Sequence, residues 1–553
     1  MSSHPVAAEL VIQNARIYTL DPKKPWVEAL AIRHGQFMAT GSLAEMTPLI
    51  DDATKVVDFA GRIVLPGLID GHCHAFEGAR AALFELALSP RDDFDQIIER
   101  VRAAAAVLPD GQWLKGGGWE GRKLLPILSH PDALKRLDEA TGHRPTVLRD
   151  ISFHTLFVNT AAMRAAGIDR NTKVPDHGGI VLDENGDPVG LLLETASSLI
   201  FEAMPSLSAG EVDAVIRHAG NVFNSCGITG LAHAVTSAQT MQGFRDADRR
   251  GELTVRVATF ISTHTPVPSE RDGTGPSVID RRQDYASQYV NVDFVKYFMD
   301  GVAVSMTAAF KAPYRSVNGG RAQSAAPFYS VEELRNLILP LDAQGISVKI
   351  HAIGDLAITH TLDAIEQVRA ANGFDGPQHS IAHLTYIDSD DIKRLSSLNV
   401  LADLCPPMWF PGPILNGSIQ LLGEERSHRG WPVRDIINSG AAVTIGSDWP
   451  AVAPSPNPWP GLSALITRED PWRANPGVFR PEQSITLEEA LPLYTINAAE
   501  SIGFGESTGS IETGKAADFI ILDRDIFSID PRDIAETKVL ATYFAGKPVY
   551  QSD

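Results

Sequence analysis

The chain has few cysteines. Only three occur among its 553 residues, namely Cys73, Cys226 and Cys405. Three widely separated cysteines cannot form a disulfide framework, and this usage is typical of a reducing compartment. We therefore expect free thiols in a cytoplasmic protein.

The sequence also lacks basic runs and long apolar segments. Its 48 lysines and arginines are outnumbered by 68 aspartates and glutamates, which gives a net charge of −20. Such a field repels nucleic acid on average. No window is long and apolar enough to cross a bilayer, and the first residues have neither the basic nor the apolar region of a signal peptide. We expect a soluble protein that uses neither nucleic acid nor a membrane as a partner.

One strand-like run stands out because it ends on two histidines. The apolar stretch from Ile63 to His74 is interrupted at Pro66-Gly67 and then resumes. In a strand, residues i and i+2 point to the same face, so His72 and His74 project side by side. Two neighbouring imidazoles suit a divalent cation. The run therefore predicts a metal site.

Further strand-like runs alternate with helical stretches, which is the pattern of βα units around a parallel sheet. Together with the first run there are eight, and eight such units predict an α/β fold with a closed (β/α)8 TIM-like barrel. The runs cover residues 63–74, 227–233, 254–260, 292–298, 347–351, 380–383, 400–404 and 442–448.

Both ends of the chain contain short β-type segments, between residues 8 and 60 and between residues 517 and 550. Neither end has enough strands to bury a face alone. We therefore predict one small β-sandwich domain from residues 1–62 plus 505–553, with the barrel in residues 63–504. Residues 81–213 would form a large insertion after the first barrel strand that caps the active site.

Polar side chains fall where several of the predicted barrel strands end, which is where barrel enzymes place reacting groups. Taken singly, each has a structural explanation. His351 can be a hydrogen-bonded core residue, and His379 competes with His383 for a role at strand six. Asp448 can cap the following segment. Lys296 can pair with Asp300 or Glu194. Their joint occurrence at matching strand ends favours one site, formed by His72, His74, Lys296, His351, His383 and Asp448.

Several longer motifs make the sequence recognisable. They are Leu65-Pro66-Gly67-Leu68-Ile69-Asp70-Gly71-His72-Cys73-His74, Val295-Lys296-Tyr297-Phe298-Met299-Asp300-Gly301, Ile350-His351-Ala352-Ile353-Gly354-Asp355, Gly446-Ser447-Asp448-Trp449-Pro450, and the closing stretch from Gly509 to Asp518. With them the chain resembles the metal-dependent amidohydrolase superfamily, and within it amidohydrolase family 3, the branch of N-substituted formamide deformylase-like and YtcJ-like proteins. The resemblance covers nearly the full length.

The resemblance implies the ligands of a divalent metal centre. His72 and His74 would hold one ion, and His351 and His383 would hold or orient a second. Lys296 would be carboxylated and bridge the two ions, although a one-metal site with a free lysine stays open. The histidines favour zinc, while manganese or iron would be tolerated. The resemblance also implies that the chain can form a homodimer.

The same resemblance implies hydrolysis of a C–N bond. Asp448 would act as general base and then as general acid, and His383 or His351 would help to polarise the substrate carbonyl. We expect a linear amide or formamide with an apolar substituent as the small-molecule substrate. A lactonase, a cyclic-imide hydrolase or a deaminase on the same site, and a non-catalytic scaffold, are the alternatives.

We expect the substrate pocket to be lined partly by aromatic side chains and by two polar groups. The residues that would contact the substrate are Trp119, His154, Glu194, Trp409 and Trp449. Ordinary packing is the competing explanation for the aromatic residues. Two positions depart from the family pattern: Ala382 stands where an acid usually precedes the strand-six histidine, and Ile151 to His154 replace an Asp-Gly-His motif. Both departures remove polarity and affect the expected substrate rather than the metal.

Overall fold

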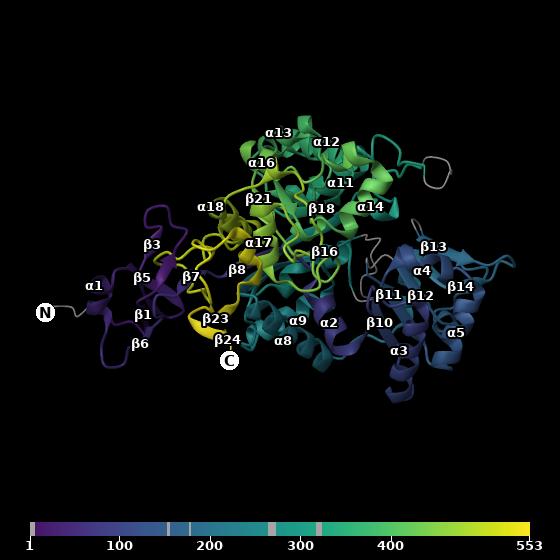
Figure 1. Cartoon of the computed structure of the whole chain (residues 1–553), viewed down its shortest axis with the longest axis horizontal. Coiled ribbons are helices and arrows are strands. Elements are labelled where there is room, and N and C mark those ends of the chain that lie inside the picture. The colour runs from purple at the N-terminus through teal and green to yellow at the C-terminus, as the bar shows by residue number, and fades with distance from the viewer. Residues whose placement is uncertain (1–5, 152–154, 176–177, 264–272, 317–322, 553) are drawn as a thin grey trace.

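A parallel sheet of eight strands forms the centre of the computed structural model, which describes residues 6–151, 155–175, 178–263, 273–316 and 323–552 (Figure 1). Neighbouring strands follow one another in chain order. The strands are β8 (Leu68–Cys73), β15 (Ile228–Thr236), β16 (Arg256–Ser262), β17 (Val290–Phe298), β18 (Ser347–Ala352), β19 (His379–His383), β20 (Val400–Leu404) and β21 (Val443–Ile445). Each contains one of the eight predicted runs or lies largely within it.

Hydrogen bonds just beyond the strands bring the first and last strands together. The amide of Asp448 donates to the His72 carbonyl at 2.8 Å, and the amide of His74 donates to the Trp449 carbonyl at 2.7 Å. Ser447 Oγ, also after β21, donates to Asp70 Oδ2 on β8 at 2.6 Å. The predicted barrel is therefore present as a nearly closed eight-stranded parallel sheet.

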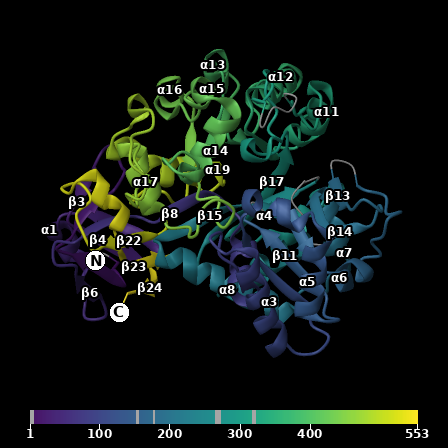
Figure 2. The ribbon, with the colours of Figure 1, turned by 45° about the vertical axis from the view of Figure 1, so that its right-hand side comes forward.

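Helices cover the outside of this barrel. They include α8 (Ala209–Ser225), α9 (Ala238–Arg249), α11 (Val331–Asp342), α12 (Asp355–Asn372) and α13 (Ser389–Ser397). Figure 2 shows the last three together on one side of the barrel. Capping boxes fix where α8 and α11 begin, because Ser208 and Ser330 exchange hydrogen bonds with Glu211 and Glu333. The strands between them are buried almost throughout, so the polar side chains on them lie inside the protein.

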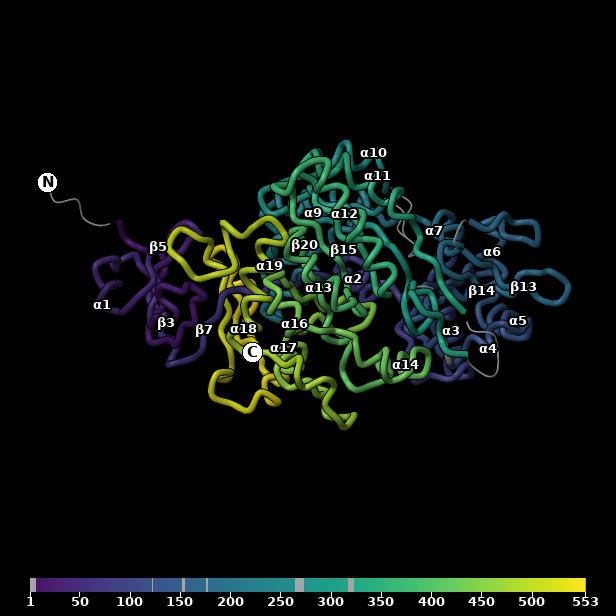
Figure 3. Tube along the Cα trace, turned by 90° about the horizontal axis from the view of Figure 1, so that it is seen from above, coloured from purple at the N-terminus to yellow at the C-terminus, as the bar shows by residue number. Residues whose placement is uncertain are grey.

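Two further sheets contain segments near the ends of the chain, on the left in Figure 3: one is built from N-terminal strands alone, and the other combines strands from both ends. One has the order β5-β4-β1-β6 and the other β24-β23-β22-β7-β2-β3. Buried side chains from both sheets, among them Ile32, Phe37, Val64, Phe519 and Tyr543, form one core cluster. The strands are β1 (Leu10–Gln13), β2 (Arg16–Tyr18), β3 (Trp26–Val27), β4 (Ala29–Arg33), β5 (Gln36–Gly41), β6 (Lys55–Asp58), β7 (Ile63–Pro66), β22 (Phe519–Leu522), β23 (Val539–Phe544) and β24 (Lys547–Gln551).

The run that was predicted as the first barrel strand serves two sheets. Its first half, β7, pairs with β2 and β22, and its second half, β8, begins the barrel. Gly67 joins the halves at a point where a Cβ atom would lie 2.2 Å from Thr229 Oγ1, so only glycine fits this passage. The paired histidines at the end of β8 are thus connected directly to the terminal sheets.

A fourth sheet lies between β8 and β15 in the sequence, with the order β13-β14-β12-β11-β10-β9. The sheet lies on the right in Figure 1. It has hydrophobic clusters of its own. Its strands are β9 (Leu86–Ala87), β10 (Leu114–Trp119), β11 (Thr146–Asp150), β12 (Thr155–Val158), β13 (Gly178–Leu182) and β14 (Pro188–Glu194). The domain limits at residues 62, 81, 213 and 505 stay predictions.

Among the described residues, no helix combines the length and the apolar character that a membrane span requires.

Candidate metal centre

Three potential metal ligands meet at the seam where the barrel closes. His72 lies near the end of the buried strand β8, His74 directly precedes α2 (Ala75–Phe84), and Asp448 follows β21. Asp448 Oδ1 lies 3.2 Å from His74 Nε2 and 3.8 Å from His72 Nε2. One ligand atom from each of the three lies within 4.8 Å of the other two. His72 and His74 are therefore adjacent to Asp448, which follows the last barrel strand, β21, and is distant in sequence.

The other side of the His72 ring is held by a buried ion pair. His72 Nδ1 lies 2.7 Å from Asp403 Oδ2, and the same oxygen lies 2.6 Å from Lys349 Nζ. Lys349 also donates to the carbonyl of Gly71 at 2.6 Å. A carboxylate on the far nitrogen of a histidine is the usual support of a metal-bound imidazole, because it fixes the tautomer and the ring orientation. His72 thus presents Nε2 to Asp448.

The next two histidines lie against this group. The His383 ring is centred 4.9 Å from the His72 ring and 4.6 Å from the His351 ring. Cys405, directly after β20, brings Sγ to 3.7 Å from His383 Nδ1. His351 Nε2 lies 3.1 Å from the Gly301 carbonyl. The four histidines predicted from the sequence therefore form one continuous cluster inside the barrel.

Lys296 is buried on β17, beside the histidines. Its side chain is 1% exposed, and Nζ lies 5.0 Å from the centre of the Phe298 ring, which in turn stacks on His351. Burial, followed by repulsion from Lys349, lowers the pKa of Lys296 to about 7. A neutral amine is the form that reacts with carbon dioxide, so this environment suits the lysine that the resemblance singles out.

Two of the cluster residues have a left-handed backbone. His383 has φ +70° and Asp448 has φ +53°. Such angles cost non-glycine residues free energy and persist only where the surroundings enforce them, which is common at functional sites. Glu194, at the end of β14, shares this feature with φ +49°.

The residues fit a divalent cation. Two nitrogen or oxygen ligands of one zinc ion lie about 3.4 Å apart, given bonds of about 2.1 Å at tetrahedral angles. The 3.2 and 3.8 Å separations around Asp448 bracket that value. Burial, reinforced by nearby Lys296 for His72 and by His351 for His383, lowers the pKa of both imidazoles well below the usual range. They are therefore neutral, which is the form that binds metal.

His379 and Asp300, the structural alternatives considered for strand six and for Lys296, have partners of their own. His379, the rival of His383, lies at the opposite end of β19, where Nε2 is 3.0 Å from Asp342 Oδ2. Asp300 accepts hydrogen bonds from the backbone amides of Ala309, Ile353 and Gly354. Its carboxylate is thus occupied by three backbone groups.

The three tryptophans that were expected to contact the substrate are buried. Trp119 lies in the core of the insertion, and its indole N–H donates to the Leu148 carbonyl. Trp409 is fully buried beneath the Arg468 guanidinium, 4.8 Å away. The Trp449 ring lies against Gly78 of α2 and Phe223 of α8. Each of the three therefore has packing partners within the protein, and their contact with a substrate stays a prediction. Glu194 is half-buried, and His154 falls outside the described residues.

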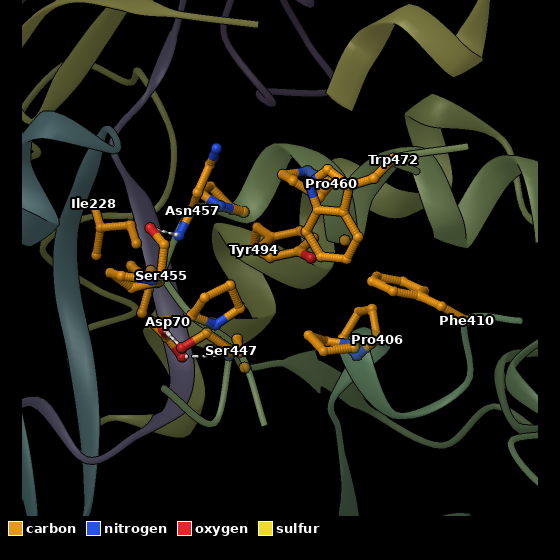
Figure 4. A pocket seen from close by; sticks show the side chains of 18 residues that line it. Asp70, Ile228, Pro406, Phe410, Ser447, Ser455, Asn457, Pro460, Trp472 and Tyr494 are labelled. Carbon is orange, nitrogen blue, oxygen red and sulfur yellow. Dashed lines mark hydrogen bonds between the residues drawn. The ribbon is translucent and has the colours of Figure 1, made fainter. Parts of the chain in front are cut away.

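A separate pocket of about 140 Å³ lies beyond the seam. Figure 4 shows Asp70 and Ser447 at one end of it and Phe410, Trp472 and Tyr494 at the other. Its lining includes Ser447 but neither Asp448 nor the four histidines. Burial raises the pKa of Asp70 to about 7, although the Ser447 hydroxyl and amide donate to its carboxylate. This pocket is distinct from the histidine cluster.

Sequence reasoning missed Lys349, Asp403 and Cys405. Lys349 and Asp403 interrupt apolar strands and are at most 2% exposed. A charged residue within a buried strand signals a paired or functional group, and Lys349 stands two residues before His351 on the same strand face. Those signals were present in the sequence. The position of Cys405 only became informative with the fold.

Comparisons with known proteins agree with this geometry. A family model described as "Amidohydrolase family" matches residues 55–550. The chain is 30% identical to "Putative amidohydrolase YtcJ" of Bacillus subtilis over 97% of this chain and 98% of that protein. It is 28% identical to "N-substituted formamide deformylase" of Arthrobacter pascens over 98% of both chains.

A solved structure shares the fold. An uncharacterized metal-dependent hydrolase from Pyrococcus horikoshii superposes with a TM-score of 0.75 at 21% identity, covering 94% of this chain and 99% of that one. The family model spans most of the chain, from β6 through the insertion and the whole barrel to β23. The chain therefore belongs to the amidohydrolase family of metal-dependent hydrolases.

Proposed function

We propose that this protein hydrolyses the C–N bond of a linear amide or N-substituted formamide that carries an apolar substituent. The observation that carries the proposal is the meeting of His72, His74 and Asp448 at the barrel seam, where burial keeps the His72 imidazole neutral beside a carboxylate. The relative named as an N-substituted formamide deformylase supports the choice of bond.

His72, His74 and Asp448 would hold a divalent cation, with His351, His383 and Lys296 beside them. Zinc suits the imidazole ligands best. When bound, such a cation polarises a carbonyl group and makes water a nucleophile near neutral pH.

The chain supplies the proton transfers and the orientation. Asp448 accepts the proton of the attacking water and then delivers it to the departing amine. The His351 and His383 rings are centred 4.6 Å apart, and we expect His383 or His351 to donate a hydrogen bond to the developing oxyanion. Asp403 keeps the His72 ring in place throughout.

Two features support an apolar substituent. Phe298 stacks on His351, and Ala382 occupies the place where the family pattern has an acid. A charged group beside these side chains would lose hydration without gaining a partner. An alkyl or aryl group on the amide nitrogen would instead bury apolar surface.

The test combines metal analysis with a substrate panel. Protein purified without chelator should contain one or two equivalents of metal, lose activity on chelation and regain it with zinc or manganese. It should release formate from N-formyl amines with aryl or alkyl substituents. Turnover of only lactones, cyclic imides or amidines would overturn the choice of bond. A protein that binds no metal under any of these conditions would overturn the mechanism.

A further inference from the structure

Cys405 lies among the candidate ligands. It directly follows β20, is fully buried, and belongs to two groups whose ligand atoms all lie within 4.8 Å of one another. One group contains His383 and Asp448, and the other contains His72 and Asp403. The thiol therefore lies close to both His383 and His72.

We propose that Cys405 is a metal ligand of this protein and binds the cation as a thiolate together with His383 and Asp448. The inference rests on the proposed metal-dependent function and adds a sulfur ligand to it. The residue that follows β20 would then be a direct ligand of the metal ion.

The distance between sulfur and nitrogen supports this assignment. Cys405 Sγ lies 3.7 Å from His383 Nδ1. A zinc ion with a sulfur ligand at about 2.3 Å and an imidazole nitrogen at about 2.1 Å holds them about 3.6 Å apart at the tetrahedral angle. The observed pair is within 0.2 Å of that spacing, without any movement of β19 or β20.

A second observation points to the same place. Asp403 is fully buried, and its Oδ2 already serves His72 and Lys349. Its other oxygen, Oδ1, has no hydrogen-bond partner among the residues that the structure describes. A buried acceptor without a partner is costly, so a bound group is expected beside it. A cation held near Cys405, with its remaining ligands, would supply that partner.

The other two cysteines have different surroundings, which makes them internal controls. Cys73 Sγ points to the Ala232 carbonyl at 3.5 Å, on the β15 side of its strand. Cys226 is half-buried at the end of α8, with Sγ 3.9 Å from Ser225 Oγ. Only Cys405 joins a group of candidate ligands among the described residues.

Coordination has a defined chemical consequence. Burial raises the pKa of the Cys405 thiol well above its usual range, so the residue is a neutral thiol without a cation. A coordinated thiol is deprotonated, and its proton passes to water when the metal binds. Sulfur also shifts preference toward zinc and cobalt and away from magnesium or manganese.

Cobalt spectroscopy on the full-length protein tests the assignment. Metal-free protein loaded with Co²⁺ should show visible ligand-field bands and, in addition, a near-ultraviolet sulfur-to-cobalt charge-transfer band. Cys405→Ser should lose the charge-transfer band and keep the visible bands. Cys226→Ser and Cys73→Ser should keep both. X-ray absorption of the zinc-loaded protein should show one sulfur scatterer at about 2.3 Å that Cys405→Ser removes.

The outcomes separate this inference from the function on which it rests. Visible bands without a charge-transfer band in the unaltered protein would overturn the cysteine ligand and leave the metal centre standing. The absence of any cobalt bands, with no metal bound, would overturn both. If Cys405→Ser fails to fold, the absorption spectrum of the unaltered zinc protein still decides between sulfur and no sulfur.

Discussion

Asp403 Oδ2 lies 2.7 Å from His72 Nδ1 and 2.6 Å from Lys349 Nζ, so one buried oxygen joins a candidate metal ligand to a buried ammonium. Burial raises the pKa of the Asp403 carboxyl, the adjacent Lys349 opposes that rise, and the same carboxyl oxygen holds the imidazole. The three residues come from β20, β8 and β18. Positioning of His72 thus depends on strands that lie across the barrel from it.

Asp403→Asn should weaken metal binding without unfolding the protein. Loss of such a supporting carboxylate typically lowers metal affinity about 10- to 100-fold. Competition with a chromophoric chelator measures the change. Asp293→Asn, on a half-exposed acid of β17, is the matched control and should leave affinity unaltered. Equal affinity in both variants would contradict the role given to Asp403.

Lys349→Met should lower stability, and Asp403→Asn, which breaks the same pair, should lower it as well. It leaves the Asp403 charge buried without its counter-ion, and breaking one partner of a buried pair costs about 3–5 kcal/mol. The double variant Asp403→Asn with Lys349→Met removes both charges and should be more stable than Lys349→Met alone. Denaturant unfolding of the metal-free proteins compares them. A double variant that is no more stable than the single one would contradict the pairing.

Asp448→Asn should abolish most turnover while the protein stays folded. General acid–base groups contribute about 10²- to 10⁴-fold to a rate, and an amide cannot accept the proton of water. Formate release under saturating metal measures the loss, and bound metal is determined on the same sample. Near-normal turnover in a folded, metal-loaded variant would contradict the role of Asp448.

Lys296 should make the stability of the metal-free protein depend on pH. Its pKa falls from 10.5 to about 7 on folding, so between these values the unfolded chain binds more protons than the folded one. The free energy of unfolding therefore rises as pH increases from about 7 to 10.5, by up to about 5 kcal/mol from this residue. The pH profile of Lys296→Met, subtracted from that of the unaltered protein, isolates the effect. A flat difference would show that Lys296 is not desolvated in solution.

The strands were predictable from sequence because each barrel strand is a short apolar run between turn residues. What the sequence could not resolve is the sheet to which a run belongs. The sequence predicts Ile63–Pro66 and Leu68–Cys73 as one strand. In the structure the chain leaves one sheet and enters another at Gly67, so the two segments belong to different sheets. That division depends on contact with Thr229, which is distant in sequence.

Site residues were predictable where polar side chains end apolar strands, as for His72 and Asp448. For the tryptophans the sequence leaves two roles open, because a ring that fills a core and a ring that lines a pocket have the same sequence context. Trp449 follows Asp448 directly, and its ring packs between α2 and α8. The sequence around Cys405 does not predict a metal ligand, because its neighbours His383 and Asp448 are known only once the order of the strands is known.

Gly446 offers a way to disturb the seam without removing a ligand. A Cβ atom there would lie 2.4 Å from the backbone nitrogen and Cβ of His72, so Gly446→Ala must push β21 away from β8. The shift would separate Asp448 from His72 and His74, and because near-attack geometry tolerates little displacement, turnover should fall roughly 100-fold while metal affinity also drops. Gly210→Ala is the control, since a Cβ at that helical position meets nothing within 4 Å and alanine favours the helix. Equal kinetics and metal affinity in the two variants would mean that closure of the barrel at this seam does not set the spacing of the ligands.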